Sequence, residues 1–136
     1  MPSAVVVRRG HFNAAHRLHN PDRSDEWNRN AFGPCNNPNF HGHNYEVEIC
    51  VEGDIDPETG YVVDVAILKA LFDQYIHSVL DHRNLNLDVE WFANRLPSAE
   101  NIAVFIWEQL APRIPAGRLQ KIRLWETPRN YVEDSG

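Results

Sequence analysis

Two histidines one residue apart, His41 and His43, begin a stretch of alternating apolar and polar residues that runs to Val51. Such alternation indicates a β-strand, on which side chains two positions apart point to the same face. The two imidazoles therefore project side by side at the start of the strand, a placement that suits metal binding. A His-x-His pair is also common without a metal, so the pair alone fits an ordinary strand as well.

A third histidine, His16, ends the apolar row of an earlier strand predicted over residues 5–16. If the two strands pair antiparallel, the end of the first lies beside the start of the second. This pairing would bring His16 next to His41 and His43. Three neutral imidazoles leave one position open on a zinc ion, which is typical of a catalytic site. Taken alone, His16 also fits a partly exposed strand end, and His11 falls on the opposite face of the strand.

Cys35 lies near the end of a long connection, residues 17–40, that is rich in Asn, Asp, Arg and Pro and leads directly to His41. A loop of this length without regular structure usually carries function or is mobile. A nearby cation stabilises a thiolate, so Cys35 is a candidate reactive thiol. The alternative is a small buried residue, which fits Cys50 better because Cys50 falls in the middle of a strand.

Asp81 and His82 directly follow a helix that is predicted to begin at the N-cap Asp64 and to end near Leu80. A histidine near a helix C-terminus is favoured in its protonated form. From the residues alone, the pair has either a functional role or the ordinary role of a capping histidine beside a solvated aspartate.

Glu126 ends the apolar row of a last strand predicted over residues 119–127. A buried carboxylate needs a partner. That partner is either a structural arginine, such as Arg123 or Arg129, or a ligand with adjacent N–H donors.

A second helix is predicted to begin at the N-cap candidate Ser98. Glu100 falls in its first turn, where the helix dipole favours a negative charge. Residues 61–63 are predicted to form a short third strand, after a turn over residues 53–60 that lacks the closing Glu of a calcium loop.

The composition fits one globular domain, with 136 residues of which 43% are hydrophobic and 24% charged. The net charge of -6 excludes the basic surface of a nucleic-acid-binding protein. No stretch is long and apolar enough to cross a membrane. Two cysteines are too few for a disulfide framework, so we expect a cytoplasmic enzyme or binding domain.

Six short motifs, spread from Phe12 to about Asn130, together match the pattern of a known family. They are Phe12-Asn13-Ala14-Ala15-His16-Arg17-Leu18, Cys35-Asn36-Asn37-Pro38-Asn39, His41-Gly42-His43-Asn44-Tyr45, Leu80-Asp81-His82-Arg83-Asn84-Leu85, Glu100-Asn101 and Glu126-Thr127. In these motifs the sequence closely resembles the 6-pyruvoyl-tetrahydropterin synthases and the related bacterial 6-carboxytetrahydropterin synthases.

The resemblance implies an α+β fold, the tunnelling fold (T-fold). This fold has an antiparallel four-stranded sheet with two helices on one face, here within a single pterin synthase domain over residues 1–136. In that family three subunits join their sheets into a barrel, and two trimers stack into a homohexamer. The active sites lie between subunits, so the site residues need not all meet within one chain.

The resemblance also implies which residues form the site, matched position by position. These are the Zn²⁺ ligands His16, His41 and His43; the catalytic residues Cys35, Asp81, His82 and Glu126; and the substrate-binding residues Ser98, Glu100 and Glu126. In this family, Glu126 corresponds to the glutamate that grips the pterin ring. Ala99 departs from the hydroxyl-bearing residue often found at its position, so one pterin contact is either missing or supplied by the backbone.

The activity implied is that of a zinc-dependent lyase, which eliminates triphosphate from 7,8-dihydroneopterin triphosphate to give 6-pyruvoyl-tetrahydropterin. The alternative, 6-carboxytetrahydropterin synthase, also releases acetaldehyde and serves queuosine biosynthesis. The five residues between Cys35 and His41 favour the pyruvoyl activity. Two further alternatives are a non-catalytic module that binds zinc and pterin, and hydrolysis by zinc-bound hydroxide.

Overall fold

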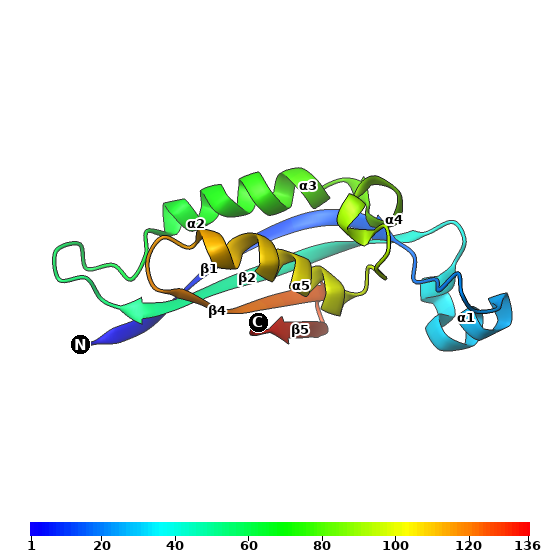
Figure 1. Ribbon diagram of the computed structural model, residues 1–136, viewed down its shortest axis with the longest axis horizontal. Helices are drawn as coiled ribbons and strands as arrows, with labels where there is room; N and C mark the ends of the chain where they lie inside the picture. The colour runs from blue at the N-terminus through cyan, green and yellow to red at the C-terminus, as the bar shows by residue number, and fades with distance from the viewer.

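Two long strands form the centre of the molecule and define its long axis (Figure 1). The computed structural model describes residues 1–136. β1 (Ser3–His16) and β2 (His41–Asp54) pair antiparallel along their whole length. Both predicted strands are therefore confirmed, and they pair in the antiparallel arrangement that would bring His16 next to His41 and His43.

The sheet has five strands in the order β3-β1-β2-β4-β5. β4 (Arg118–Thr127) pairs antiparallel with β2, and β5 (Asn130–Asp134) pairs antiparallel with β4. β3 (Arg83–Asn84) pairs with β1 in parallel. The expected four-stranded antiparallel sheet is therefore wrong in detail: the sheet is mixed, because the chain returns alongside β1 after the first long helix and folds back once more after β4.

The third strand predicted over residues 61–63 is not formed. Val62 and Val63 are buried in the hydrophobic core but belong to no ladder of the sheet. Their apolar character, which suggested a strand, serves to pack the connection between β2 and the next helix.

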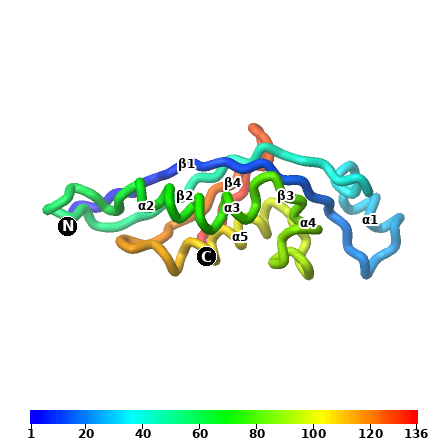
Figure 2. The backbone as a smooth tube through the Cα atoms, turned by 90° about the horizontal axis from the view of Figure 1, so that it is seen from above, coloured from blue at the N-terminus to red at the C-terminus, as the bar shows by residue number.

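Two helical segments cover one face of the sheet, as predicted (Figure 1). The first consists of α2 (Val65–Phe72), a π-helical turn (Asp73–His77) and α3 (Ser78–Leu80). The second is α5 (Ala99–Leu110). In Figure 2, α2 and α3 follow the course of β1, while α5 packs against β4 and β5.

Both predicted N-caps are present. The side chain of Asp64 accepts a hydrogen bond from the backbone N–H of Ala66. The side chain of Ser98 does the same for Asn101. Such caps satisfy backbone donors that have no partner within the helix.

The core lies between the sheet and these helices. Phe12, Tyr45 and Ile49 project from the strands, and Ile76 and Ile106 project from the helices, all with at most 1% exposure. Burial of this apolar surface is the main stabilising contribution to such a layered fold.

The connection over residues 17–40 is not structureless, contrary to expectation. It contains α1 (Asp25–Phe32) and a 3₁₀ helix (Gly33–Asn36), and α1 stands beyond the end of the sheet (Figure 1). α1 has a side-chain cap from Ser24 and lacks a wide apolar stripe. Its buried Asn28 hydrogen-bonds the preceding loop, so polar contacts define this helix and the apolar pattern did not reveal it.

Shorter helices complete the chain: α4 (Leu85–Asp88) and the 3₁₀ turns Glu90–Phe92 and Ala111–Arg113. None of the helices has both the length and the apolar character that a membrane span requires.

Candidate metal centre and active site

Three imidazoles meet where β1 ends and β2 begins. His16 lies directly opposite His41 in the β1–β2 ladder, and His43 lies opposite Ala14. The ring centroids are 4.5 Å apart for His16 and His41, 5.1 Å for His16 and His43, and 4.9 Å for His41 and His43. One nitrogen of each ring lies within 4.8 Å of the others. The convergence predicted from strand parity is thus confirmed.

The three rings leave several buried nitrogens without a partner. Nε2 of His16, both ring nitrogens of His41 and Nε2 of His43 are buried and make no hydrogen bond. Unsatisfied buried polar atoms are costly and rare in folded proteins. A cation between the rings would satisfy them, so the three residues fit the zinc ion that the resemblance implies.

The tautomer of His16 suits a metal ligand. Its Nδ1 lies 2.7 Å from the carbonyl oxygen of Pro97, which only accepts hydrogen bonds, so Nδ1 carries the proton. Nε2 is then left with a free lone pair. Burial, followed by the neighbouring imidazoles of His41 and His43, lowers the pKa of His16 to about 4 despite the opposing bond to Pro97.

His41 shows the same trend as His16. Burial and the charge of His43 lower the pKa of His41, against a smaller opposing effect of Glu126. Neutral imidazoles are the form that binds a metal. His16 and His41 therefore present unprotonated nitrogens at neutral pH.

Tyr45 forms the floor of the cluster. It is fully buried, stacks on Phe12, and has its hydroxyl 3.5 Å from Nδ1 of His16. Burial and the nearby charge of Glu126 raise the pKa of Tyr45 well above its usual range. Its hydroxyl therefore stays protonated at neutral pH.

Cys35 is half-buried in the 3₁₀ helix that precedes β2. Its carbonyl oxygen accepts a hydrogen bond from the backbone N–H of Leu18, 2.9 Å away, and the side chain of Asn36 donates to the carbonyl oxygen of Leu18 at 2.7 Å. These bonds fasten the cysteine segment to the residues that follow His16.

The charges of the chain itself do not activate Cys35. Burial, and secondly the carboxylate of Glu126, raise the pKa of the Cys35 thiol. The thiolate is thus disfavoured unless positive charge is added nearby. A cation held by the three histidines would supply such charge.

Glu126 lies beside the histidines and is not paired with an arginine. Its Oε1 is 3.7 Å from Nε2 of His43. Arg123 instead pairs with Glu48 and Glu133 on the other face of β4. The structural-arginine alternative for Glu126 is therefore wrong for Arg123, and Arg129 makes no ion pair with it either. A cavity of about 570 Å³ borders both His43 and Glu126.

Asp81 and His82 are fastened to β1 at Asn13. The backbone N–H of Asn13 donates to Oδ1 of Asp81 at 2.9 Å, and the backbone N–H of His82 donates to the carbonyl oxygen of Asn13 at 2.6 Å. Oδ2 of Asp81 lies 2.7 Å from Nδ1 of His82. His82 has a positive φ of 59°, a conformation that costs energy in a non-glycine residue.

The Asp81–His82 pair is not joined to the three histidines within this chain. Neither residue makes a hydrogen bond or ion pair with the cluster or with Cys35, and the side chain of His82 is 77% exposed. His82 does border a cavity of about 660 Å³ that also reaches His43. The exposed imidazole is thus free to meet groups outside its own chain.

Ser98 and Glu100 lie at the start of α5, next to the bond between Pro97 and His16. The Ser98 hydroxyl is occupied as the helix N-cap. Glu100 is exposed and makes no ion pair. Of these two residues, Glu100 has the free side chain.

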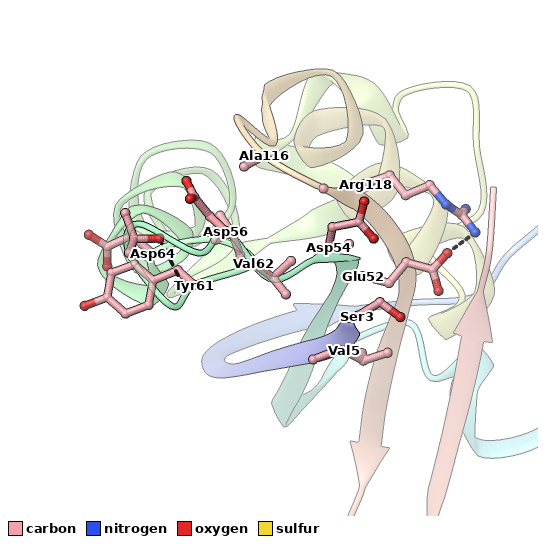
Figure 3. A pocket seen from close by; sticks show the side chains of 15 residues that line it. Ser3, Val5, Glu52, Asp54, Asp56, Tyr61, Val62, Asp64, Ala116 and Arg118 are labelled. Atoms are coloured by element: carbon pink, nitrogen blue, oxygen red, sulfur yellow. Dashed lines mark hydrogen bonds and ion pairs between the residues drawn. The ribbon is translucent and has the colours of Figure 1, made fainter. Parts of the chain in front are cut away.

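The largest cavity of the molecule lies elsewhere, at the opposite end of β1 and β2 (Figure 3). It measures about 1060 Å³ and is bordered by Ser3, Asp54, Tyr61 and Arg118, with Arg118 paired to Glu52. None of the residues with candidate chemistry lines it. Cavity size therefore does not identify the functional site in this protein.

Some groups at the site had no signal in the sequence. The carbonyl oxygen of Pro97 and the backbone N–H of Asn13 are main-chain atoms, which every sequence position supplies. Tyr45 did have a signal, since it belongs to the same apolar row as His41 and His43.

Comparison with known proteins finds similarity to 6-pyruvoyl tetrahydropterin synthases along nearly the whole chain. The family model described as "6-pyruvoyl tetrahydropterin synthase" matches residues 5–135. The human protein named 6-pyruvoyl tetrahydrobiopterin synthase is 47% identical over 133 residues, which cover 98% of this chain and 92% of that protein. A Pyrococcus furiosus protein named dihydroneopterin monophosphate aldolase is 34% identical over 131 residues and 96% of each chain.

A solved structure supports this similarity in three dimensions. The 6-pyruvoyl tetrahydropterin synthase of Caenorhabditis elegans superposes with a TM-score of 0.95 at 39% identity. The match covers 100% of this chain and 97% of that one.

Proposed function

The chain belongs to the 6-pyruvoyl tetrahydropterin synthase family, and we propose that it is a zinc-dependent lyase that converts 7,8-dihydroneopterin triphosphate into 6-pyruvoyl-tetrahydropterin and triphosphate. The observation that carries this proposal is the cluster of three histidines with unpartnered buried nitrogens. Five relatives that bear the name of this synthase are 41% to 47% identical, one from Dictyostelium discoideum is 32% identical, and the relative named as an aldolase is 34% identical.

His16, His41 and His43 would hold the zinc ion. When bound, zinc acts as a Lewis acid that acidifies substrate hydroxyls and adjacent carbon and stabilises negative charge. Three imidazole ligands leave room for substrate oxygen. The bond from His16 to Pro97 supports the cluster by fixing the orientation of one ligand ring.

Cys35, as thiolate, is the proposed base that removes a proton from carbon. Burial raises the pKa of its thiol, so this role requires the positive charge of an occupied metal site. Its segment is fastened to the residues directly after His16, which supports a place at the same site.

His82, oriented by Asp81, is the proposed proton relay. The bond from its Nδ1 to the carboxylate leaves Nε2 free to exchange protons. Its high exposure and its separation from Cys35 support action at a site completed by a neighbouring subunit. We accordingly propose the homohexamer, a dimer of trimers, as the working form.

Glu126 is proposed to hold the pterin ring by accepting hydrogen bonds from the 2-amino and N3 groups. A carboxylate accepts two parallel N–H bonds in the geometry that it uses with a guanidinium. The absence of an arginine partner leaves its oxygens available. Ser98 and Glu100 would contribute at the start of α5, and a cytoplasmic location fits the two free cysteines.

The experiment that tests the function is incubation of the zinc-loaded protein with 7,8-dihydroneopterin triphosphate, followed by mass spectrometry of the products. We expect triphosphate and 6-pyruvoyl-tetrahydropterin in equal amounts. Acetaldehyde would instead identify the carboxy-type reaction of queuosine biosynthesis, and the absence of turnover by zinc-loaded protein would favour a binding module.

A further inference from the structure

The carboxylate of Asp81 contacts two imidazoles, those of His82 and His77. Only His82 has a role in the proposed reaction. Oδ2 lies 2.7 Å from Nδ1 of His82 and 3.4 Å from Nε2 of His77. Oδ1 accepts the backbone N–H of Asn13. Both imidazoles therefore lie next to the same oxygen, Oδ2, while Oδ1 binds the carboxylate to β1.

The fold holds His77 in this place. His77 ends the π-helical turn within the first long helix, and its carbonyl oxygen accepts the backbone N–H of Asp81 at 2.9 Å. Residues four apart on a helix lie on one face, which brings the His77 ring to the carboxylate. π-helical turns of this kind often occur at functional sites. The ring is 41% exposed, so it exchanges protons with solvent.

We propose that His77 is a positioning residue that sets the proton affinity of His82 through their common carboxylate oxygen. The proposal rests on the proposed role of His82 as a proton relay. A proton on His77 draws on the negative charge of Asp81 and disfavours a second positive charge on His82.

The other groups around this pair are few. His11 faces His77 from β1, with ring centroids 6.4 Å apart. Arg83, Asp88 and His43 border the cavity at His82. Because these groups stay the same when only His77 is replaced, a change in His82 would report on His77 itself.

The carboxylate itself carries a charge at neutral pH, as the proposal requires. The backbone N–H of Asn13 lowers the pKa of Asp81 most, and the imidazoles of His82 and His77 add to this effect. Asp81 is therefore a shared anion that either protonated ring stabilises.

Two substitutions of His77 should move His82 in opposite directions. In full-length zinc-loaded protein with ¹³C-labelled histidine, the pH midpoint of the His82 ring signal is followed by NMR. His77→Ala frees the carboxylate for His82 and should raise the midpoint by roughly half a pH unit. His77→Lys places a permanent positive charge there and should lower the midpoint by a similar amount. A loss of packing would not give shifts of opposite sign.

Three further variants complete the test. His82→Asn identifies the His82 signal, and His77→Gln, a neutral donor, should give an intermediate midpoint. His11→Asn is the control, because His11 makes no bond to Asp81, and it should leave the midpoint unchanged. Equal midpoints in the Ala and Lys variants would overturn the proposal.

Turnover separates this proposal from the proposed function. If His82 is the relay, the pH profile of turnover should move in the same direction as the His82 midpoint. Opposite NMR shifts with an unmoved pH profile would uphold the action of His77 on His82 and contradict the relay role of His82.

Discussion

Nδ1 of His16 lies 2.7 Å from the carbonyl oxygen of Pro97, although the two residues are 81 positions apart in the chain. This one bond decides which ring nitrogen of His16 is available to a metal. It also joins the histidine cluster to the segment that starts α5, where Ser98 lies. The histidine cluster and one wall of the proposed pterin site are thus built as a unit.

Replacement of His41 or His43 by Ala should remove zinc and activity together. With two imidazoles left, the site loses one of its three protein ligands, and we expect zinc affinity to fall at least about 100-fold. Metal analysis after dialysis against a weak chelator measures this directly. His19→Ala is the control, because His19 bonds Asn36 outside the cluster. Stoichiometric zinc in the His41 and His43 variants would contradict the ligand assignment.

Replacement of Cys35 by Ala should abolish turnover, while zinc content and pterin affinity stay within about twofold. The reason is that the thiolate is proposed to act only in proton transfer, and a group in that role contributes roughly 10²–10⁴-fold to the rate. The measurements are steady-state turnover, metal analysis and pterin binding by calorimetry. Cys50→Ala is the matched control, since Cys50 is the other cysteine and lies in the middle of β2. An active Cys35→Ala variant would exclude Cys35 from the mechanism.

The sequence predicted those parts of the fold that depend on local pattern. Alternation over Tyr45 to Val51 predicted β2, and the capping side chains of Asp64 and Ser98 marked two helix starts. α1 and β5 escaped prediction because α1 lacks a wide apolar stripe and β5 follows β4 after a turn of only two residues. The predictions relied on the periodicity of apolar residues, and neither α1 nor β5 leaves a signal of that kind.

For the site, side-chain parity and the assumed antiparallel pairing of the two strands were enough to bring the three histidines together, because a strand permits only two side-chain directions. The environment of each group was not predictable in the same way. The rise in the pKa of Cys35 depends on burial and on Glu126, which is distant in sequence. The contact of His77 with Asp81 did have a local signal, the spacing of four residues before a helix end.

Replacement of Glu126 by Gln should weaken pterin binding much more than zinc binding. The amide presents one acceptor and one donor where the pterin offers two donors, so we expect pterin affinity to fall at least about tenfold, or about 1.4 kcal/mol. Calorimetry with 7,8-dihydroneopterin and metal analysis measure the two effects separately. Glu133→Gln, on β5, is the control. Unchanged pterin affinity would exclude the recognition role, and loss of zinc would assign Glu126 to the support of His43.

Replacement of Gly10 by Ala should destabilise the fold without changing the contacts of the histidine cluster. A Cβ at this position would lie 2.6 Å from Cε1 of Phe72, the last residue of α2, whose side chain is buried. Overpacking of this kind costs about 1–3 kcal/mol. Urea denaturation at constant protein concentration measures the loss. The double variant with Phe72→Leu should recover part of it relative to the two single variants, and a strictly additive result would contradict a direct clash.

Replacement of Asp81 by Asn should lower stability in a way that depends on pH. The backbone N–H of Asn13, and then His82 and His77, lower the pKa of Asp81 in the folded protein below its ordinary value of 3.8. Folding therefore favours the charged carboxylate, and this stabilisation is fully present above the unfolded pKa and is lost as the pH falls through the folded pKa. At pH 7 we expect the variant to be less stable by about 1 kcal/mol, the difference between a charged and a neutral acceptor.

The same variant should approach the parent protein in stability below about pH 4, where the carboxylate of the unfolded chain becomes protonated. Urea denaturation at neutral and acidic pH, on metal-free protein at one concentration, gives the two differences. Asp22→Asn is the control, because the Asp22 side chain is exposed and accepts no hydrogen bond. A stability difference that stays constant between the two pH values would show that Asp81 acts through packing, since an electrostatic contribution must disappear once the carboxylate is neutral in both states.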